Sequence, residues 1–165
     1  MADDDDGGAG SLTNSMSHIR PLRRPYSMNL IVHRICLILL TIVGLSLGVW
    51  AYFAPLNWYS TFPGMGMSWL PVLGPYNEHF VKDVGAMFFA LGVLSALAVY
   101  YLVNRPVVVI TAVCWSIFNA LHLIYHIPML HMYGPRDLVL NAISLSLILA
   151  ISLALLVPAR SPDRG

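Results

Sequence analysis

Four long apolar segments constrain this chain more than any other feature of its sequence. A transmembrane helix needs roughly 20 mostly apolar residues, and such runs lie at about residues 30–54, 80–103, 106–128 and 138–157. Only 10% of the 165 residues are charged, whereas a soluble domain has about 25%. We therefore expect an all-α protein, a four-span transmembrane helix bundle.

The remaining composition narrows the class of protein further. The formal net charge of +1 says little about partners, because in membrane proteins the distribution of charge carries the information. We expect no binding to nucleic acid. Cys36 and Cys114 both lie in apolar runs and fit small buried side chains with no disulfide. Of the nine basic residues only Lys82 is a lysine, a bias typical of GC-rich bacterial genomes.

Basic residues near the span ends predict the orientation, because Lys and Arg concentrate on the cytoplasmic side. Seven arginines fall on one side of the four spans, while Lys82 and Arg136 fall on the other, beside carboxylates; the seven are Arg20, Arg23, Arg24, Arg34, Arg105, Arg160 and Arg164. We expect a multi-pass plasma-membrane protein with both termini cytoplasmic. Residues 1–27 would be a disordered tail, residues 28–158 the membrane domain and residues 159–165 a second cytoplasmic tail.

The external loop between the first two spans, residues 54–77, contains no charged residue but is rich in proline, glycine and aromatic side chains, namely Trp58, Tyr59, Phe62, Trp69 and Tyr76. Loops longer than about 12–15 residues are usually functional or disordered, and this loop is too aromatic for disorder. We expect a folded lid in the outer interface, where Trp and Tyr concentrate. A plain aromatic belt with no gating role is the alternative.

The polar residues inside the predicted spans gather at one end of the bundle. They are His79, Asp83, Asn119, His122, His126 and Asn141. From the rise of about 1.5 Å per helical residue, Asp83, His122 and Asn141 are expected at a similar depth in the outer leaflet. Ionisable groups in a membrane normally face the bundle interior, so three helices would present an acid, an imidazole and an amide to one pocket.

Four interpretations fit this cluster. It is a hydrogen-bonded network that sets helix packing, a pocket for the head group of a lipid or quinone, an acid–base pair or proton relay of Asp83 with His122, or a metal or haem site. For a metal, His122 and His126 have the i, i+4 spacing of helical ligands, and His79 with Asp83 would complete four, with His131 as a substitute. For haem, His79 would pair with His122 or His126.

Other residues have mainly structural interpretations. His33 beside Arg34 is expected to snorkel to the cytoplasmic interface. Arg136 opens the fourth span, where it either serves the helix start or recognises an anionic head group beside the lid.

The pairs Gly44/Gly48 and Ala86/Ala90 have the small-xxx-small spacing that allows close helix packing; the glycine pair would equally suit a homodimer. Spans two and three, joined by a very short turn, are expected to form an antiparallel hairpin.

The four short spans, the long first external loop and the segments YNEH at 76–79 and DVGA at 83–86 resemble the DoxX-like group of small bacterial membrane proteins over roughly residues 28–157. The resemblance implies a four-helix membrane fold and a link to redox or quinone-associated systems, with no catalytic residue carried over. We therefore expect a non-catalytic accessory component, or one that associates with lipid or quinone through the outer pocket. The alternative is a small membrane enzyme with an Asp/His acid–base or metal site. Expected partners are membrane lipids, a larger membrane complex or a second copy.

Overall fold

The computed structural model describes residues 28–158, and all regular structure in that range is helical. The tails expected at 1–27 and 159–165 lie outside the described residues. The elements are α1 (Met28–Phe53), α2 (Pro55–Thr61), α3 (Glu78–Tyr100), α4 (Arg105–His126), the 3-10 helix η1 (Ile127–Met132) and α5 (Pro135–Ala154). Four helices, α1, α3, α4 with η1, and α5, are long and apolar enough to cross a membrane. The four predicted spans are confirmed as helices.

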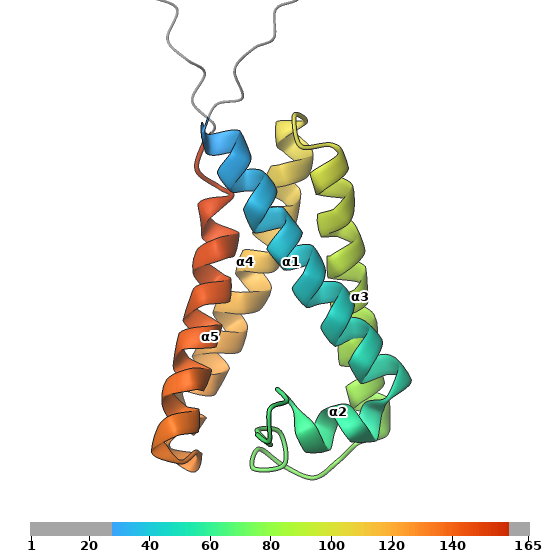
Figure 1. The fold of residues 1–165 in the computed structure, drawn as a ribbon, viewed down its shortest axis with the longest axis vertical. Coiled ribbons are helices and arrows are strands. Elements are labelled where there is room, and N and C mark those ends of the chain that lie inside the picture. Colours follow the sequence, from blue (N-terminus) through green and yellow to red (C-terminus); the bar gives the residue numbers. More distant parts are fainter. Residues whose placement is uncertain (1–27, 159–165) are drawn as a thin grey trace, which may run out of the picture.

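The four long helices form two close pairs, α1 with α3 and α4 with α5. The pairs converge where the described chain begins and ends and diverge toward α2 (Figure 1). We call the first the terminal end and the second the lid end. The expected antiparallel hairpin of spans two and three is present: the short turn after Tyr100 joins α3 to α4, and Phe88 of α3 packs on Trp115 of α4. However, α3 packs more extensively on α1.

Glycines on both helices explain why α1 and α3 pack together. A Cβ atom added to Gly44 would lie 2.6 Å from the Cα of Gly92, and one added to Gly48 would lie 2.5 Å from the backbone nitrogen of Phe89. A Cβ on Gly85 would lie 2.7 Å from a backbone nitrogen of α1. The two backbones touch at these positions, which confirms the predicted packing role of Gly44 and Gly48.

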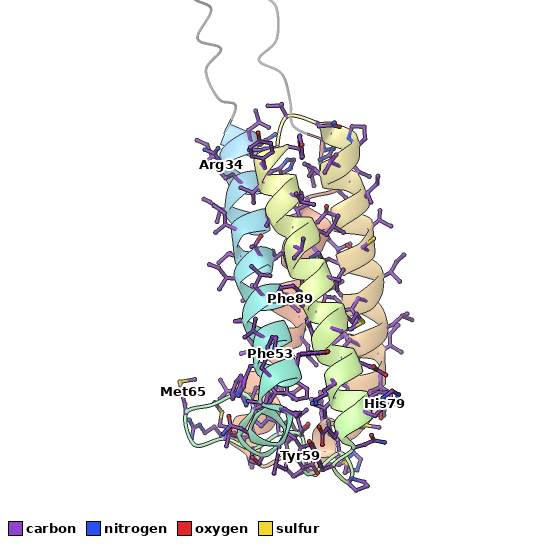
Figure 2. All side chains as sticks on the ribbon, turned by 90° about the vertical axis from the view of Figure 1, so that its right-hand side faces the viewer. Arg34, Phe53, Tyr59, Met65, His79 and Phe89 are labelled. Carbon is purple, nitrogen blue, oxygen red and sulfur yellow. The ribbon has the colours of Figure 1, made fainter. Side chains whose placement is uncertain are left out.

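The small pair predicted on α3 is wrong, because Ala86 and Ala90 are exposed on the outer surface of the bundle. The buried face of α3 instead runs through positions spaced by three or four residues, as one face of a helix requires; these positions are Val81, Gly85, Phe88, Gly92, Ser95 and Ala98. Side chains such as that of Phe89 project outward from the α1–α3 pair (Figure 2).

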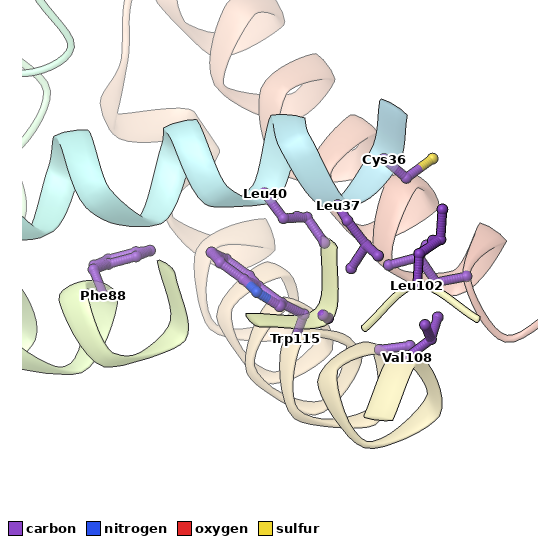
Figure 3. Packing of buried hydrophobic residues seen from close by; sticks show 10 residues of the cluster. Cys36, Leu37, Leu40, Phe88, Leu102, Val108 and Trp115 are labelled. Atoms are coloured by element: carbon purple, nitrogen blue, oxygen red, sulfur yellow. The ribbon is translucent and has the colours of Figure 1, made fainter. Parts of the chain in front are cut away.

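The largest apolar cluster lies toward the terminal end, where the two helix pairs meet. Trp115 of α4 is fully buried there and packs with Leu37 and Leu40 of α1 (Figure 3). Its indole Nε1 donates a hydrogen bond of 2.8 Å to the Ser95 hydroxyl of α3, so the buried N–H is satisfied. This core holds the pairs together at one end and leaves the other end to the lid.

The segment 54–77 is folded, as expected, and we call it the lid. Its aromatic rings pack consecutively: Phe62 lies 5.5 Å from Trp58 and 6.0 Å from Trp69 between ring centroids. The backbone N–H of Trp69 donates to the carbonyl of Phe62 at 2.8 Å. Through Phe62 the lid joins one apolar cluster on α1 and α3, around Val81, and another at the start of α5, around Tyr133. The lid therefore connects the two helix pairs.

Arg105 and His33 have structural roles at the terminal end. The Arg105 guanidinium donates to the carbonyl oxygens of Leu155 at 2.7 Å and Leu156 at 2.6 Å, which caps the end of α5. His33 is buried, with only 4% of its surface exposed, which corrects the expectation that it snorkels outward. It lies one position before Arg34 on α1, and Arg34 is the exposed member of the two (Figure 2).

Candidate functional site

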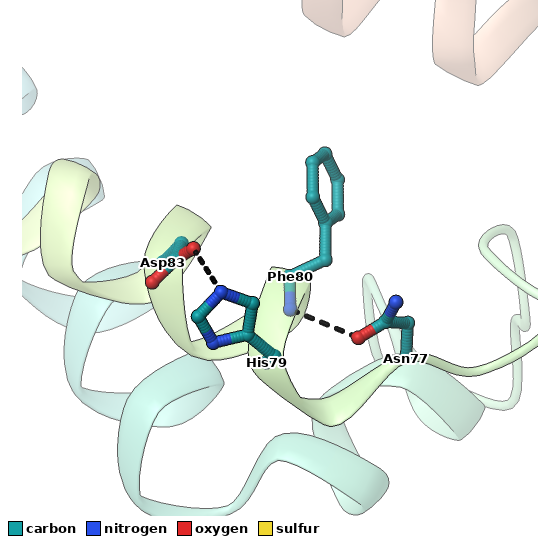
Figure 4. A network of polar contacts seen from close by, with 4 residues as sticks. All are labelled: Asn77, His79, Phe80 and Asp83. Carbon is teal, nitrogen blue, oxygen red and sulfur yellow. Dashed lines mark hydrogen bonds and ion pairs between the residues drawn. The ribbon is translucent and has the colours of Figure 1, made fainter.

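The structure separates the predicted polar residues into an exposed group and a buried group. His79 and Asp83 are exposed, with 88% and 64% of their side-chain surfaces accessible, and their Nε2 and Oδ2 atoms lie 3.4 Å apart (Figure 4). They point away from α1 because the buried face of α3 passes through Val81 and Gly85 instead. This corrects the expected position of Asp83 inside the bundle: it does not join His122 and Asn141 in an interior pocket.

The start of α3 places the exposed pair next to the lid. Asn77 occupies the N-cap position, and its Oδ1 accepts a hydrogen bond of 3.2 Å from the backbone N–H of Phe80 (Figure 4). Glu78 in the first turn is bonded to Lys82 at 2.9 Å, and an acid there also suits the helix dipole. These contacts serve the helix terminus, and the side chains of Glu78, His79, Lys82 and Asp83 all remain at least partly exposed.

The buried group lies between α4 and α5. The Asn119 amide nitrogen donates to the Ile148 carbonyl at 3.4 Å and to the Ser152 hydroxyl at 3.5 Å, so this asparagine is a packing residue. It also shows the antiparallel register of the two helices. Seven residues closer to the lid end, the matching positions are His126 on α4 and Asn141 on α5. Both side chains are buried. His126 and Asn141 therefore face each other's helix at one level.

His122 and His126 form part of a row of rings along α4. The His122 imidazole stacks on Phe118, with centroids 5.3 Å apart and planes at 16°, and it lies 4.4 Å from the His126 ring. His126 meets Tyr125 edge-on. The two imidazoles are thus adjacent to each other and to aromatic rings, while Asp83, the acid of the predicted acid–base pair, lies on the outer face of α3.

Four buried polar atoms at the lid end have no hydrogen-bond partner within the described part of the chain. They are Trp58 Nε1, Trp69 Nε1, His126 Nδ1 and Asn141 Oδ1; Ser116 Oγ, further along α4, is the fifth such atom. Leaving a buried polar group unsatisfied costs about 1–3 kcal/mol. Sequence reasoning treated the two tryptophans only as lid aromatics, although a buried indole N–H normally has a partner.

Tyr133 attaches the lid to the start of α5, beside these atoms. Its hydroxyl donates to the Trp69 carbonyl at 3.1 Å, and the two rings lie 6.3 Å apart in an edge-on arrangement. The Asn141 amide contacts the same hydroxyl. Burial raises the pKa of Tyr133 above its ordinary value, so the hydroxyl keeps its proton and donates throughout the neutral range.

We expect Tyr133→Phe to loosen the lid without unfolding the bundle. The variant removes one hydrogen bond of about 1 kcal/mol but keeps the ring contact with Trp69. Amide hydrogen exchange in residues 64–76 should become about fivefold faster, since 1.4 kcal/mol corresponds to tenfold. Tyr101→Phe, at an exposed position of the terminal end, is the matched control. Equal exchange rates in the two variants would show that this bond does not hold the lid.

The predicted metal set is not assembled. Among residues 28–158, no three His, Cys, Asp or Glu side chains are placed so that they could hold a metal ion. His79 and Asp83 are on the exposed face of α3, whereas His122 and His126 are on α4, and His131 Nδ1 lies 2.7 Å from the carbonyl of Pro128. The same separation removes the expected haem pairing of His79 with an α4 histidine. Arg136 is exposed at the start of α5.

No protein-family model, curated protein or solved structure matches this chain. The resemblance to the DoxX-like group therefore stays a prediction.

Proposed function

We propose that this protein is a non-catalytic integral membrane component that holds the polar head group of a quinone-like or lipid-like amphiphile at its lid end. The observation that carries the proposal is the set of four unpartnered buried polar atoms. Two belong to the lid and two to the α4–α5 pair. Polar groups buried in proteins are normally hydrogen-bonded. A bound molecule between the lid and the helices would supply the hydrogen-bond partners that these residues do not provide for one another.

The chemistry of the four atoms favours an uncharged head group. Indole Nε1 atoms only donate, the Asn141 Oδ1 only accepts, and the His126 Nδ1 takes either role according to its tautomer. A head group with carbonyl oxygens and a hydroxyl, as in a quinone–quinol couple, matches this pattern. Glu78, Lys82 and Asp83 do not contribute, because they are on the outer side of α3. Burial raises the pKa of the Tyr133 hydroxyl, and Asp137, in the first turn of α5, is close enough to raise it further. This carboxylate disfavours an anionic head group.

The apolar tail of such a molecule would lie in the bilayer against the helices. Large apolar side chains are exposed along each of them, for example Ile42 of α1, Ile117 of α4 and Leu147 of α5. Surface of this kind is stable in contact with lipid chains and not with water. Placing the head group under the lid thus leaves the tail in its ordinary environment.

The orientation in this proposal has the lid end in the outer leaflet of a bacterial plasma membrane and both termini in the cytoplasm. It is supported by the arginines of the terminal end and by the acids, Glu78, Asp83 and Asp137, which all lie at the starts of the helices that leave the lid end. An accessory role in a larger membrane complex or in a homo-oligomer is part of the same proposal. A small enzyme is the alternative, but its Asp83–His122 pair is separated in the structure.

Native mass spectrometry of the gently extracted protein tests the binding proposal. We expect a retained amphiphile, and we expect Trp69→Phe and Asn141→Leu each to lower its retention about tenfold, since each removes a hydrogen bond to the head group. Asn104→Leu is the matched control, because this exposed asparagine lies at the terminal end and its side chain makes no capping bond. A folded protein that never carries a bound amphiphile, or equal losses in the control, would contradict the proposal.

A further inference from the structure

Two adjacent cavities lie at the terminal end of the bundle, opposite the lid. A cavity of about 260 Å³ there is lined by Leu30, His33, Leu102, Val103, Arg105, Val108 and Pro158. A neighbouring cavity of about 230 Å³ is lined by Leu30, Ile31, Arg34 and Leu102. Because both include Leu30 and Leu102, the two are adjacent, and we call them together the terminal cleft. Its floor is apolar, and its basic side chains are Arg34, Arg105 and His33.

The positive charge of the terminal cleft has no acidic counterpart in the described chain. The three acids within 28–158 are Glu78, Asp83 and Asp137, and all belong to the lid end. The ion pair of Glu78 with Lys82 and the contact of His79 with Asp83 are likewise formed on α3 near the lid. Arg105 donates to neutral carbonyl oxygens, so its charge is oriented but not neutralised, and Arg34 is exposed (Figure 2).

We propose that the terminal cleft binds an anionic phospholipid. The phosphate would be held by Arg34 and by the free donors of Arg105, beside the buried ring of His33. An acyl chain would cover Leu30 and Leu102. Guanidinium groups suit phosphate oxygens in both charge and geometry, and basic pockets between transmembrane helices at the cytoplasmic side bind lipid head groups of this kind.

The cleft favours a phospholipid over a soluble anion because its basic and apolar parts are continuous. Leu30 lines both cavities, and Ile31 beside it on α1 is 51% exposed. A free anion would use only the arginines and leave this surface uncovered. A phospholipid satisfies both parts at once. This site is separate from the one proposed under the lid, since the two lie at opposite ends of the bundle.

Native mass spectrometry of delipidated protein, titrated with phosphatidylglycerol and with phosphatidylcholine of the same acyl chains, tests this proposal. We expect phosphatidylglycerol to bind more tightly, and Arg34→Gln to reduce that preference about fivefold, which corresponds to one basic group near a lipid head group. Lys82→Gln is the matched control, because Lys82 is a partly exposed cation at the lid end. The control should leave the preference unchanged.

Leu102→Trp provides a second variant that keeps every charge. By filling the apolar floor of the cleft, it should weaken binding of phosphatidylglycerol while the protein remains folded, as judged by its thermal unfolding. Equal affinity of the wild type for the two lipids would overturn the proposal. So would equal loss of preference in Arg34→Gln and Lys82→Gln, which would show that only overall charge matters.

Discussion

Replacing Gly92 by valine is expected to separate α1 from α3 and to lower the free energy of unfolding by about 3 kcal/mol, the upper range for overpacking a tight interface. A Cβ at this position would lie 2.6 Å from the backbone nitrogen of Leu45 and 2.9 Å from the carbonyl carbon of Gly44. Both are backbone atoms, so no side-chain rotation relieves the clash. The helices would have to move apart along their whole contact.

Helix propensity favours valine over glycine and so opposes the loss of stability expected from packing. Valine is a better helix former than glycine by a few tenths of a kcal/mol, so a net loss of stability can come only from packing. Equilibrium unfolding in mixed micelles, followed by tryptophan fluorescence, measures the difference. Ala90→Val is the matched control, since Ala90 is two residues away on α3 but exposed. If both variants unfold alike, the glycine contact does not hold α1 to α3.

Replacing Arg105 by glutamine is expected to lower stability by about 2 kcal/mol and to release the last turn of α5. Hydrogen bonds to charged groups contribute about 1.5–3 kcal/mol, and here two carbonyl oxygens, those of Leu155 and Leu156, lose their donor. Only 11% of the apolar window of α5 is buried, against 28% for each of the other spans, but Ser152 and Leu155 at this end are fully buried. The paired hydrogen bonds therefore act together with this packing, and their loss should free the last turn and not the whole helix.

Hydrogen exchange at residues 152–157 together with equilibrium unfolding measures this effect. Arg105→Lys keeps the charge but lacks the planar fork that reaches two acceptors, and we expect it to fall between the wild type and Arg105→Gln. Arg34→Gln removes a neighbouring charge that makes no such bond and should leave both readouts unchanged. If Arg105→Lys restores full protection, charge near the helix end is sufficient and the paired hydrogen bonds are not.

The helices could be predicted because the bilayer imposes a simple length rule. Each predicted span ends within three residues of the corresponding helix, since roughly 20 apolar residues are needed to cross the hydrocarbon core whatever surrounds them. The faces of these helices could not be predicted in the same way. In water, apolar periodicity shows which face is buried; in a membrane, the lipid-facing side is apolar as well.

Asp83, Ala86 and Ala90 of α3 are residues whose buried or exposed position was predicted wrongly for this reason. Position 83 shares an i, i+4 stripe with His79 and leads into Ala86 and Ala90, a pattern that suggested an inward polar and small-residue face. The glycine contact with α1 instead turns the face of Gly85 and Gly92 inward. The whole predicted stripe of α3 therefore points outward, and Asp83 leaves the candidate site.

The sequence by itself determined that this protein has four apolar helices and an uncharged aromatic lid, because each follows from residue type and position along the chain. It also placed the three acids of residues 28–158 at one end and two of the three arginines, Arg34 and Arg105, at the other. Only the tertiary structure decided which of these groups meet. It paired α1 with α3 through backbone contact, left four polar atoms at the lid end without partners, and directed Arg105 to the end of α5. Such contacts depend on how each helix is rotated about its axis. Because both the core-facing and the lipid-facing sides of a membrane helix are apolar, its sequence does not show that rotation.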